Sequence, residues 1–205
     1  MVIANSAPTL TILENGDRLN RVEFERRYTA SNIKKAELIE GLVYVASSVR
    51  FTTHAKPHAQ IVGWLGTYQA MKTDLKIGIE PTVRLDADNE PQPDAVLFRL
   101  EGNAQVDEDG YITGSPELIV EIAASTVSYD LHAKKRVYER SGVKEYIVWR
   151  TLDQAIDWFV LENGKYVELA PDAAGIMHSR EFEGLRLNVT AILNDYMSAV
   201  LKTLQ

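Results

Sequence analysis

The sequence predicts an α/β (α+β) fold in which helices flank one mixed β-sheet. Short apolar segments of strand type are mixed with amphipathic helical segments, and a strand–helix–strand unit lies near the middle of the chain. The chain has 205 residues, of which 45% are apolar and 25% charged, so it is long enough to bury a core of its own. We therefore expect a single domain over residues 1–205, with an N-terminal arm, residues 1–30, that carries a short surface helix.

Composition excludes several classes of protein. The chain has no cysteine, which excludes disulfides, thiolate zinc sites, iron–sulfur clusters and cysteine nucleophiles. No apolar run approaches the roughly 20 residues that a membrane span needs, and the start lacks the features of a secretory signal, so we expect a cytoplasmic protein. With a net charge of −7, binding to nucleic acid would require a local basic patch or a bound cation.

The first elements are a helix and a hairpin. The helix covers residues 17–28 and should place Leu19, Val22 and Phe24 on its apolar side. The hairpin covers residues 36–46, where two apolar strands flank a turn at Gly41 that supplies a positive φ.

A longer helix and three strands follow. The helix is predicted to begin at Pro57 and to continue to Met71, because proline suits the first helical position and apolar residues recur at a spacing of three and four. The strands cover residues 82–85, 95–98 and 117–123, and the last of these is almost continuously apolar.

The C-terminal half continues the sheet. A helix over residues 130–140 is predicted to end at Gly142, and it connects the strand before it to the strand after it as a crossover. A helix over residues 189–204 closes the chain. The remaining strands of this half are expected at residues 144–149, 155–160 and 165–169.

Two acidic residues stand at positions where a strand should be apolar. Glu121 interrupts the apolar run of residues 118–123, where an ionised carboxylate must be paired, protonated or bound to a cation. A structural salt bridge is the alternative interpretation. Asp94 stands at the entry to the strand over residues 95–98, where a simple turn aspartate would also be found.

Lys134 lies on the side of the predicted helix that should rest on the sheet. On a helical projection it falls between Leu131 and Val137, in the middle of the apolar face. One interpretation is that the ammonium points back to Glu121 on the preceding strand. The other is that the stem is buried while the ammonium extends to water.

Two carboxylates on neighbouring strands and one lysine are sufficient for metal-assisted hydrolysis of a phosphodiester. Oxygen ligands such as Asp94 and Glu121 favour a hard divalent cation, most naturally Mg²⁺. Such a cation lowers the pKa of a bound water and neutralises charge on the phosphate. Lys134 would position that water or stabilise the developing negative charge.

Several spaced segments support a resemblance to a known family. They cover residues 92–98, 115–125, 128–134 and 138–146. In order and separation they resemble the Uma-two family of restriction endonucleases, within the PD-(D/E)XK nuclease superfamily, and the resemblance extends over about residues 15–200.

The resemblance implies a restriction-endonuclease-like core with a metal site. Asp94 corresponds to the aspartate of the superfamily motif and Glu121 to its second acidic residue. Together with the backbone carbonyl of Ile122, they would bind the cation. Ala123 stands where the superfamily has its lysine, and resembling members take a lysine from the following helix, which is Lys134 here.

Other polar residues are weaker candidates. Glu37 could add a carboxylate, although a glutamate on a strand is more often a surface residue. His54 and His58 are four residues apart, but we expect no shared metal because Pro57 should start the helix between them. His132 should lie on the outer side of its helix.

The sequence therefore predicts a DNA endonuclease that depends on Mg²⁺ or Mn²⁺. The alternative is a catalytically silent nuclease-fold module for DNA binding or protein interaction, which Ala123 and the acidic charge favour. The same site would also permit hydrolysis of RNA or of a small phosphodiester. DNA is the expected partner, either through a local basic excess over residues 134–150 or through the cation, and a homodimer is expected because a two-fold protein suits a two-fold duplex.

Overall fold

A mixed six-stranded sheet forms the centre of the molecule. The computed structural model describes residues 12–205, so residues 1–11 of the predicted N-terminal arm lie outside the described residues. The order across the sheet is β11-β10-β9-β8-β5-β3, and of its neighbouring pairs only β8 and β9 run parallel. The strands are β3 (Leu75–Ile79), β5 (Ala95–Arg99), β8 (Leu118–Ala123), β9 (Glu145–Arg150), β10 (Ala155–Glu162) and β11 (Lys165–Glu168). The predicted mixed sheet flanked by helices is therefore confirmed.

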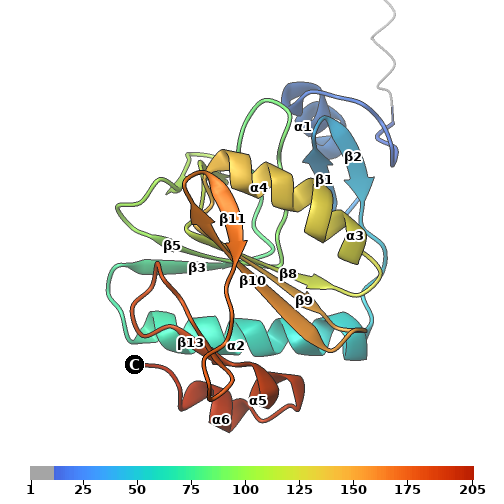
Figure 1. Ribbon diagram of the computed structural model, residues 1–205. Coiled ribbons are helices and arrows are strands. Elements are labelled where there is room, and N and C mark those ends of the chain that lie inside the picture. The colour runs from blue at the N-terminus through green and yellow to red at the C-terminus, as the bar shows by residue number, and fades with distance from the viewer. Residues whose placement is uncertain (1–11) are drawn as a thin grey trace, which may run out of the picture.

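Helices cover both faces of this sheet (Figure 1). On one face lies α2 (Lys56–Ala70), which continues from a π-helical turn, η1 (Phe51–Ala55). The other face is covered by one continuous helical segment made of α3 (Val127–Tyr129), the π-helical turn η2 (Asp130–Lys134) and α4 (Lys135–Ser141). This segment is the predicted crossover, and it ends where Gly142 adopts a left-handed conformation with φ 84°.

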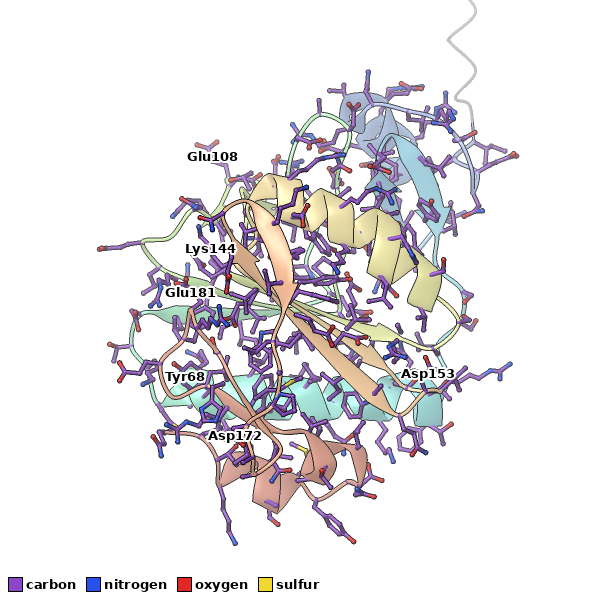
Figure 2. All side chains as sticks on the ribbon, in the orientation of Figure 1. Tyr68, Glu108, Lys144, Asp153, Asp172 and Glu181 are labelled. Carbon is purple, nitrogen blue, oxygen red and sulfur yellow. The ribbon has the colours of Figure 1, made fainter. Side chains whose placement is uncertain are left out.

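Each face of the sheet has its own apolar core. Tyr68, labelled in Figure 2, lies on α2 and closes one end of the first core, where its hydroxyl donates to the carbonyl of Glu183 at 2.7 Å. The largest fully buried side chains of this core are Trp64 and Trp158. In the second core Tyr138 packs against Tyr146 with ring centroids 5.0 Å apart, and this core lies under α4.

The N-terminal elements form a smaller layer beside the second core. They are α1 (Arg21–Thr29), β1 (Ala36–Ile39) and β2 (Leu42–Val45). The predicted hairpin turn is present, with positive φ at Glu40 and Gly41. Phe24 is buried as predicted, whereas Val22 is 75% exposed, so the predicted apolar face of this helix was wrong at that position.

The closing helix predicted over residues 189–204 is broken in two. The structure has α5 (Val189–Leu193) and α6 (Met197–Leu201), separated by a turn in which Asp195 has φ 63°. The carboxylate of Asp195 accepts hydrogen bonds from Lys56 at 2.7 Å and Gln60 at 3.0 Å, both on α2. These tertiary contacts, together with the tolerance of aspartate for the left-handed region, explain the break.

Several short strands were missed by the sequence analysis. β3 has an alternation of Leu75, Ile77 and Ile79 that could have indicated a strand, but Gly78 interrupts it. The other missed strands are two or three residues long and depend on tertiary pairing: β6 (Gln105–Val106), β7 (Ile112–Thr113), β12 (Ile176–His178) and β13 (Arg186–Asn188). The strand predicted over residues 82–85 is present as β4 (Val83–Arg84). Across residues 12–205, no helix combines the length and the apolar character that crossing a bilayer requires.

Candidate functional site

The two acidic candidates lie side by side on neighbouring strands. β5 and β8 pair with Ala95 opposite Val120, so the preceding residue, Asp94, falls opposite Glu121 on the same face. The backbone N–H of Ile122 donates to Asp94 Oδ2 at 2.7 Å. Each carboxylate is only 3% exposed. Ionised groups this deeply buried need partners of opposite charge.

Lys134 provides one such partner from the helix above the sheet. Its Nζ lies 2.9 Å from Glu121 Oε1 and 2.9 Å from Glu37 Oε1, and 3.9 Å from Asp130 Oδ1. The ammonium therefore points back to the sheet, as one of the two interpretations predicted, and does not extend to water. Tyr138 lies four residues further along the same helical segment, and its hydroxyl donates to Glu121 Oε1 at 2.8 Å.

Negative charge exceeds positive charge around this ammonium. Burial alone would lower the pKa of Lys134, but Glu121, Glu37 and Asp130 outweigh it and raise the pKa well above its ordinary value. Burial raises the pKa of Glu121 well above its ordinary range, and Lys134 offsets this only in part. Burial likewise raises the pKa of Asp130 to about 6. Glu121 and Asp130 therefore hold a proton more readily than ordinary carboxylic acids do.

Glu37 belongs to this cluster and is not a surface residue. It is 7% exposed on β1, which brings it to Lys134 across the edge of the second core. Its Oε1 also accepts from the backbone N–H of Gln92 at 3.1 Å, and its Oε2 accepts from the hydroxyl of Tyr129 at 3.3 Å. These contacts fix the carboxylate beside Glu121.

A second group of residues, which the sequence analysis did not bring together, surrounds the other oxygen of Asp94. Asp94 Oδ1 lies 3.2 Å from Nε2 of His54 and 3.5 Å from Nζ of Lys35, and that ammonium lies 2.9 Å from Glu80 Oε1. His58 Nε2 lies 2.7 Å from the backbone oxygen of Asp94. Burial acts to raise the pKa of Asp94, but His54 and Lys35 outweigh it and lower the pKa below its ordinary range.

The predicted start of the helix at Pro57 was wrong. Helical structure begins at Phe51, before Pro57, so both imidazoles follow one continuous helical segment at a spacing of four residues. His54, His58, Glu80 and Asp94 each offer one ligand atom, and these atoms lie within 4.8 Å of one another. The spacing of the histidines was the available signal, and the position assumed for the start of the helix concealed it.

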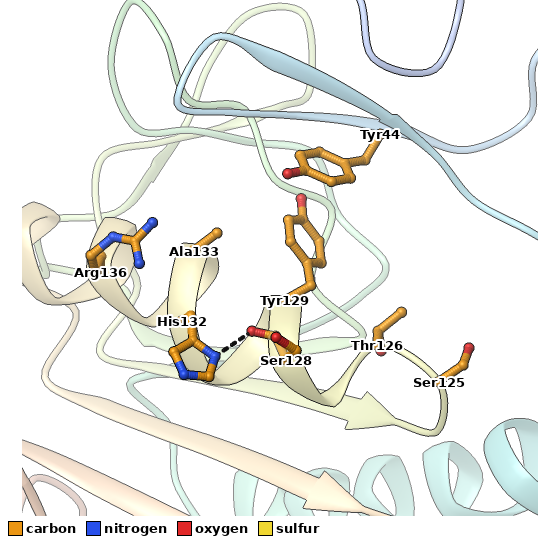
Figure 3. Close-up of a pocket in the computed structure, with 8 residues that line it drawn as sticks. All are labelled: Tyr44, Ser125, Thr126, Ser128, Tyr129, His132, Ala133 and Arg136. Carbon is orange, nitrogen blue, oxygen red and sulfur yellow. Dashed lines mark hydrogen bonds between the residues drawn. The ribbon is translucent and has the colours of Figure 1, made fainter.

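An open pocket lies next to the cluster (Figure 3). It has a volume of about 500 Å³. Tyr129 connects it to the acids, because the ring lines the pocket while the hydroxyl reaches Glu37. Tyr44 lies across from Tyr129 with ring centroids 4.1 Å apart. The remaining lining residues are mostly polar: Ser125, Thr126, Ser128, His132, Ala133 and Arg136.

The local basic excess that the sequence indicated is partly paired with acids. Arg136 and Arg140 both pair with Glu40 at 3.0 Å, and Arg150 pairs with Asp153 and Asp157 at 2.7 Å. Arg136 and Arg140 share a single carboxylate, so part of the basic excess on this helical segment remains. His132 is exposed, as predicted for the outer side of the helix.

The comparisons give one family for the sequence and one similar fold. A family model described as "Uma2: Putative restriction endonuclease" matches residues 21–190, and no curated protein matches the chain. The fold is similar to the crystal structure of "a putative nuclease belonging to DUF820" from Anabaena variabilis, with a TM-score of 0.60 and 12% identity over 84% of this chain and 97% of that chain. At that identity the likeness establishes the fold alone. Because the family model covers most of the chain, the predicted resemblance is confirmed, and the protein belongs to the Uma2 family.

Proposed function

We propose that this protein is a metal-dependent nuclease that hydrolyses phosphodiester bonds of DNA. The observation that carries the proposal is the pairing of two buried carboxylates, Asp94 and Glu121, on neighbouring strands beside the ammonium of Lys134. Membership of the Uma2 family supports the reaction class. A homodimer would place two such sites on the two strands of a duplex.

The residues present fit a hard divalent cation. Both contacts to Glu121, from Lys134 and from Tyr138, go to Oε1, which leaves Oε2 for a cation. The Ile122 carbonyl oxygen lies 3.1 Å from His54 Nδ1, and the second lone pair of that oxygen remains for a metal. Oxygen donors of this kind suit Mg²⁺ or Mn²⁺.

A bound Mg²⁺ or Mn²⁺ would lower the pKa of a water and offset charge on the scissile phosphate. The chain's own residues orient the reaction. Lys134 has three N–H donors, of which Glu37 and Glu121 take two, so the third can hold the attacking water. Tyr138 holds the Glu121 carboxylate in one orientation. The polar pocket beside Tyr129 would accept the substrate.

A catalytically silent module is the second candidate. Ala123 stands where the superfamily lysine is expected, and the ammonium of Lys134 is already held by two carboxylates. Two arginines of the helix above the site, Arg136 and Arg140, are paired with Glu40, which favours a protein or metal ligand over bare DNA. In that case the acids would bind a cation without cleaving a phosphodiester.

Cleavage of supercoiled plasmid DNA tests the proposal. We expect nicking or linearisation in Mg²⁺ or Mn²⁺, and we expect Asp94→Asn to abolish it, since the variant loses an anionic ligand. Asp172→Asn is the matched control, because Asp172 is an exposed acid whose partner is His178, away from β5 and β8. If the wild type cleaves no DNA while calorimetry still shows Mn²⁺ binding that Glu121→Gln removes, the silent module is the better description.

A further inference from the structure

A second set of donor atoms meets at Oδ1 of Asp94, the oxygen that His54 and Lys35 approach. We propose that His54, Asp94 and Glu80 form a second cation site, distinct from the site at Glu121 and selective for a transition metal such as Mn²⁺ or Zn²⁺. The ligands would be His54 Nε2, Asp94 Oδ1 and a carboxylate oxygen of Glu80. The inference rests on the proposed function only in that Asp94 serves both sites.

The hydrogen bonding of His54 points to a metal ligand. Its Nδ1 lies 3.1 Å from the Ile122 carbonyl oxygen, which can only accept, so Nδ1 carries the proton. Imidazoles that bind metals are usually oriented in this way, with the second nitrogen donating to a backbone carbonyl. In the neutral imidazole the remaining nitrogen, Nε2, then has a lone pair directed at the cluster, and in the imidazolium it carries a proton that faces Asp94 Oδ1 and that a metal would replace. Within residues 12–205 this buried nitrogen has no partner in hydrogen-bond geometry.

The distance between His54 and Asp94 matches two ligands of one metal. Nε2 and Oδ1 are 3.2 Å apart. Two ligands at about 2.1 Å from a metal are separated by about 3.0 Å at a right angle and by about 3.4 Å at a tetrahedral angle. A lone pair facing a carboxylate oxygen at this distance is repulsive unless a proton or a cation lies between them.

Lys35 takes the position of the cation in the present structure. Its ammonium lies between Glu80 Oε1, at 2.9 Å, and Asp94 Oδ1, at 3.5 Å. The Lys35 side chain is 25% exposed and that of Glu80 is 45% exposed, so both can move toward solvent. We expect the ammonium to leave when a metal binds, because the two positive charges would compete for the same oxygens.

The imidazole decides which metals this second site prefers. Nitrogen ligands suit zinc and other first-row transition metals, whereas Mg²⁺ favours oxygen ligands and retains its waters. Millimolar Mg²⁺ should therefore displace Mn²⁺ from the site at Glu121 but not from the site at His54. His58, which lies within the same cluster and contacts the backbone oxygen of Asp94, would hold the strand end in place.

Electron paramagnetic resonance of the full chain with Mn²⁺ tests the second site. Electron spin-echo modulation in excess Mg²⁺ should show coupling of Mn²⁺ to a ¹⁴N nucleus. His54→Ala should remove that coupling and weaken Mn²⁺ binding at least tenfold, since loss of even an outer-shell partner costs about tenfold to 100-fold. His178→Ala is the matched control, because it removes an exposed imidazole that also pairs with an aspartate at 2.7 Å.

Lys35→Met gives a prediction of opposite sign. Removing the competing ammonium should tighten Mn²⁺ binding. If Lys35 merely supports the fold, its loss would weaken Mn²⁺ binding.

Glu80→Gln tests the second site if His54→Ala is unstable, because it changes an exposed side chain. This variant should weaken Mn²⁺ binding. Glu121→Gln separates the two proposals, because it should leave the ¹⁴N coupling intact even if it abolishes cleavage. Bound Mn²⁺ without ¹⁴N coupling, or equal affinity in the His54→Ala variant, would overturn the inference.

Discussion

Two lysines contact the buried acids, Lys134 at Glu37 and Glu121 and Lys35 at Asp94, and their surroundings differ. Lys134 is 4% exposed and is held between Glu37 and Glu121, which are also closed to solvent. Lys35 contacts Asp94 from a position where a quarter of its side chain is exposed, and its other partner, Glu80, is largely in water. A lysine–carboxylate pair is therefore a fixed structural contact at Lys134 and an exchangeable contact at Lys35.

One fold can therefore hold a carboxylate whose partner is fixed beside a carboxylate whose partner can exchange. A buried ion pair loses its partner only at high cost, because the remaining charge cannot be solvated. A pair near the surface exchanges its partner for water or for a metal at little cost. Glu121 is thus fixed in orientation, while the Oδ1 side of Asp94 is open to a ligand.

The largest expected effect on stability comes from removing the buried ammonium of Lys134. Lys134→Met leaves two buried carboxylates without their ammonium and should lower the free energy of unfolding by about 3–5 kcal/mol. Lys35→Met should cost less than about 1 kcal/mol, because its contacts are partly solvated. Urea unfolding of both variants measures the contrast, and equal losses would show that the two sides do not differ.

A smaller effect is expected from the hydroxyl that orients Glu121. Tyr138→Phe removes a buried donor 2.8 Å from Glu121 Oε1, and we expect a loss of about 1–3 kcal/mol because a buried acceptor loses a partner. Tyr129→Phe is the matched variant, since its hydroxyl donates to Glu37 at 3.3 Å beside an open pocket. It should cost less in the same unfolding experiment. A larger loss of unfolding free energy for Tyr129→Phe than for Tyr138→Phe would contradict the distinction between the buried contact and the contact beside the open pocket.

Glu90 sharpens the comparison because it is a buried acid without a lysine. The nearest guanidinium nitrogen, from Arg84, lies 4.0 Å from its Oε2. Burial and the neighbouring Glu25 raise the pKa of Glu90 from 4.5 to about 9. Between these values the unfolded chain releases a proton that the folded chain keeps, so stability falls as the pH rises, by at most about 1.4 kcal/mol per pH unit. Below pH 4.5 both states hold the proton and this contribution is complete.

Unfolding at pH 5 and at pH 8 measures this dependence. Glu90→Gln cannot ionise, so its stability relative to the wild type should increase from pH 5 to pH 8. Glu108→Gln, which changes an exposed acid labelled in Figure 2, serves as the control and should follow the wild type. Parallel pH profiles for wild type and Glu90→Gln would mean that Glu90 is ionised in the folded protein.

Part of the candidate site could be predicted from local patterns. Glu121 stands out because an acid in an apolar strand must have a partner. Lys134 was placed correctly because helical periodicity determines which side of a helix faces the sheet. Lys35 and Glu80 carry no such signal, since each is an ordinary charged residue beside a strand. Their meeting at Asp94 depends on β1 and β3 reaching the same end of β5, and local sequence does not encode that arrangement.

The sequence by itself determined the class of fold, the main strands of the sheet, the crossover helix and two of the acids. These features depend on periodicity and on turn chemistry, which act over a few residues. Tertiary structure alone decided the short strands, the break at Asp195 and the position of Glu37 and His54 around the acids. The physical reason is that charges and hydrogen bonds between distant segments act only after the sheet and its helices have brought those segments into contact.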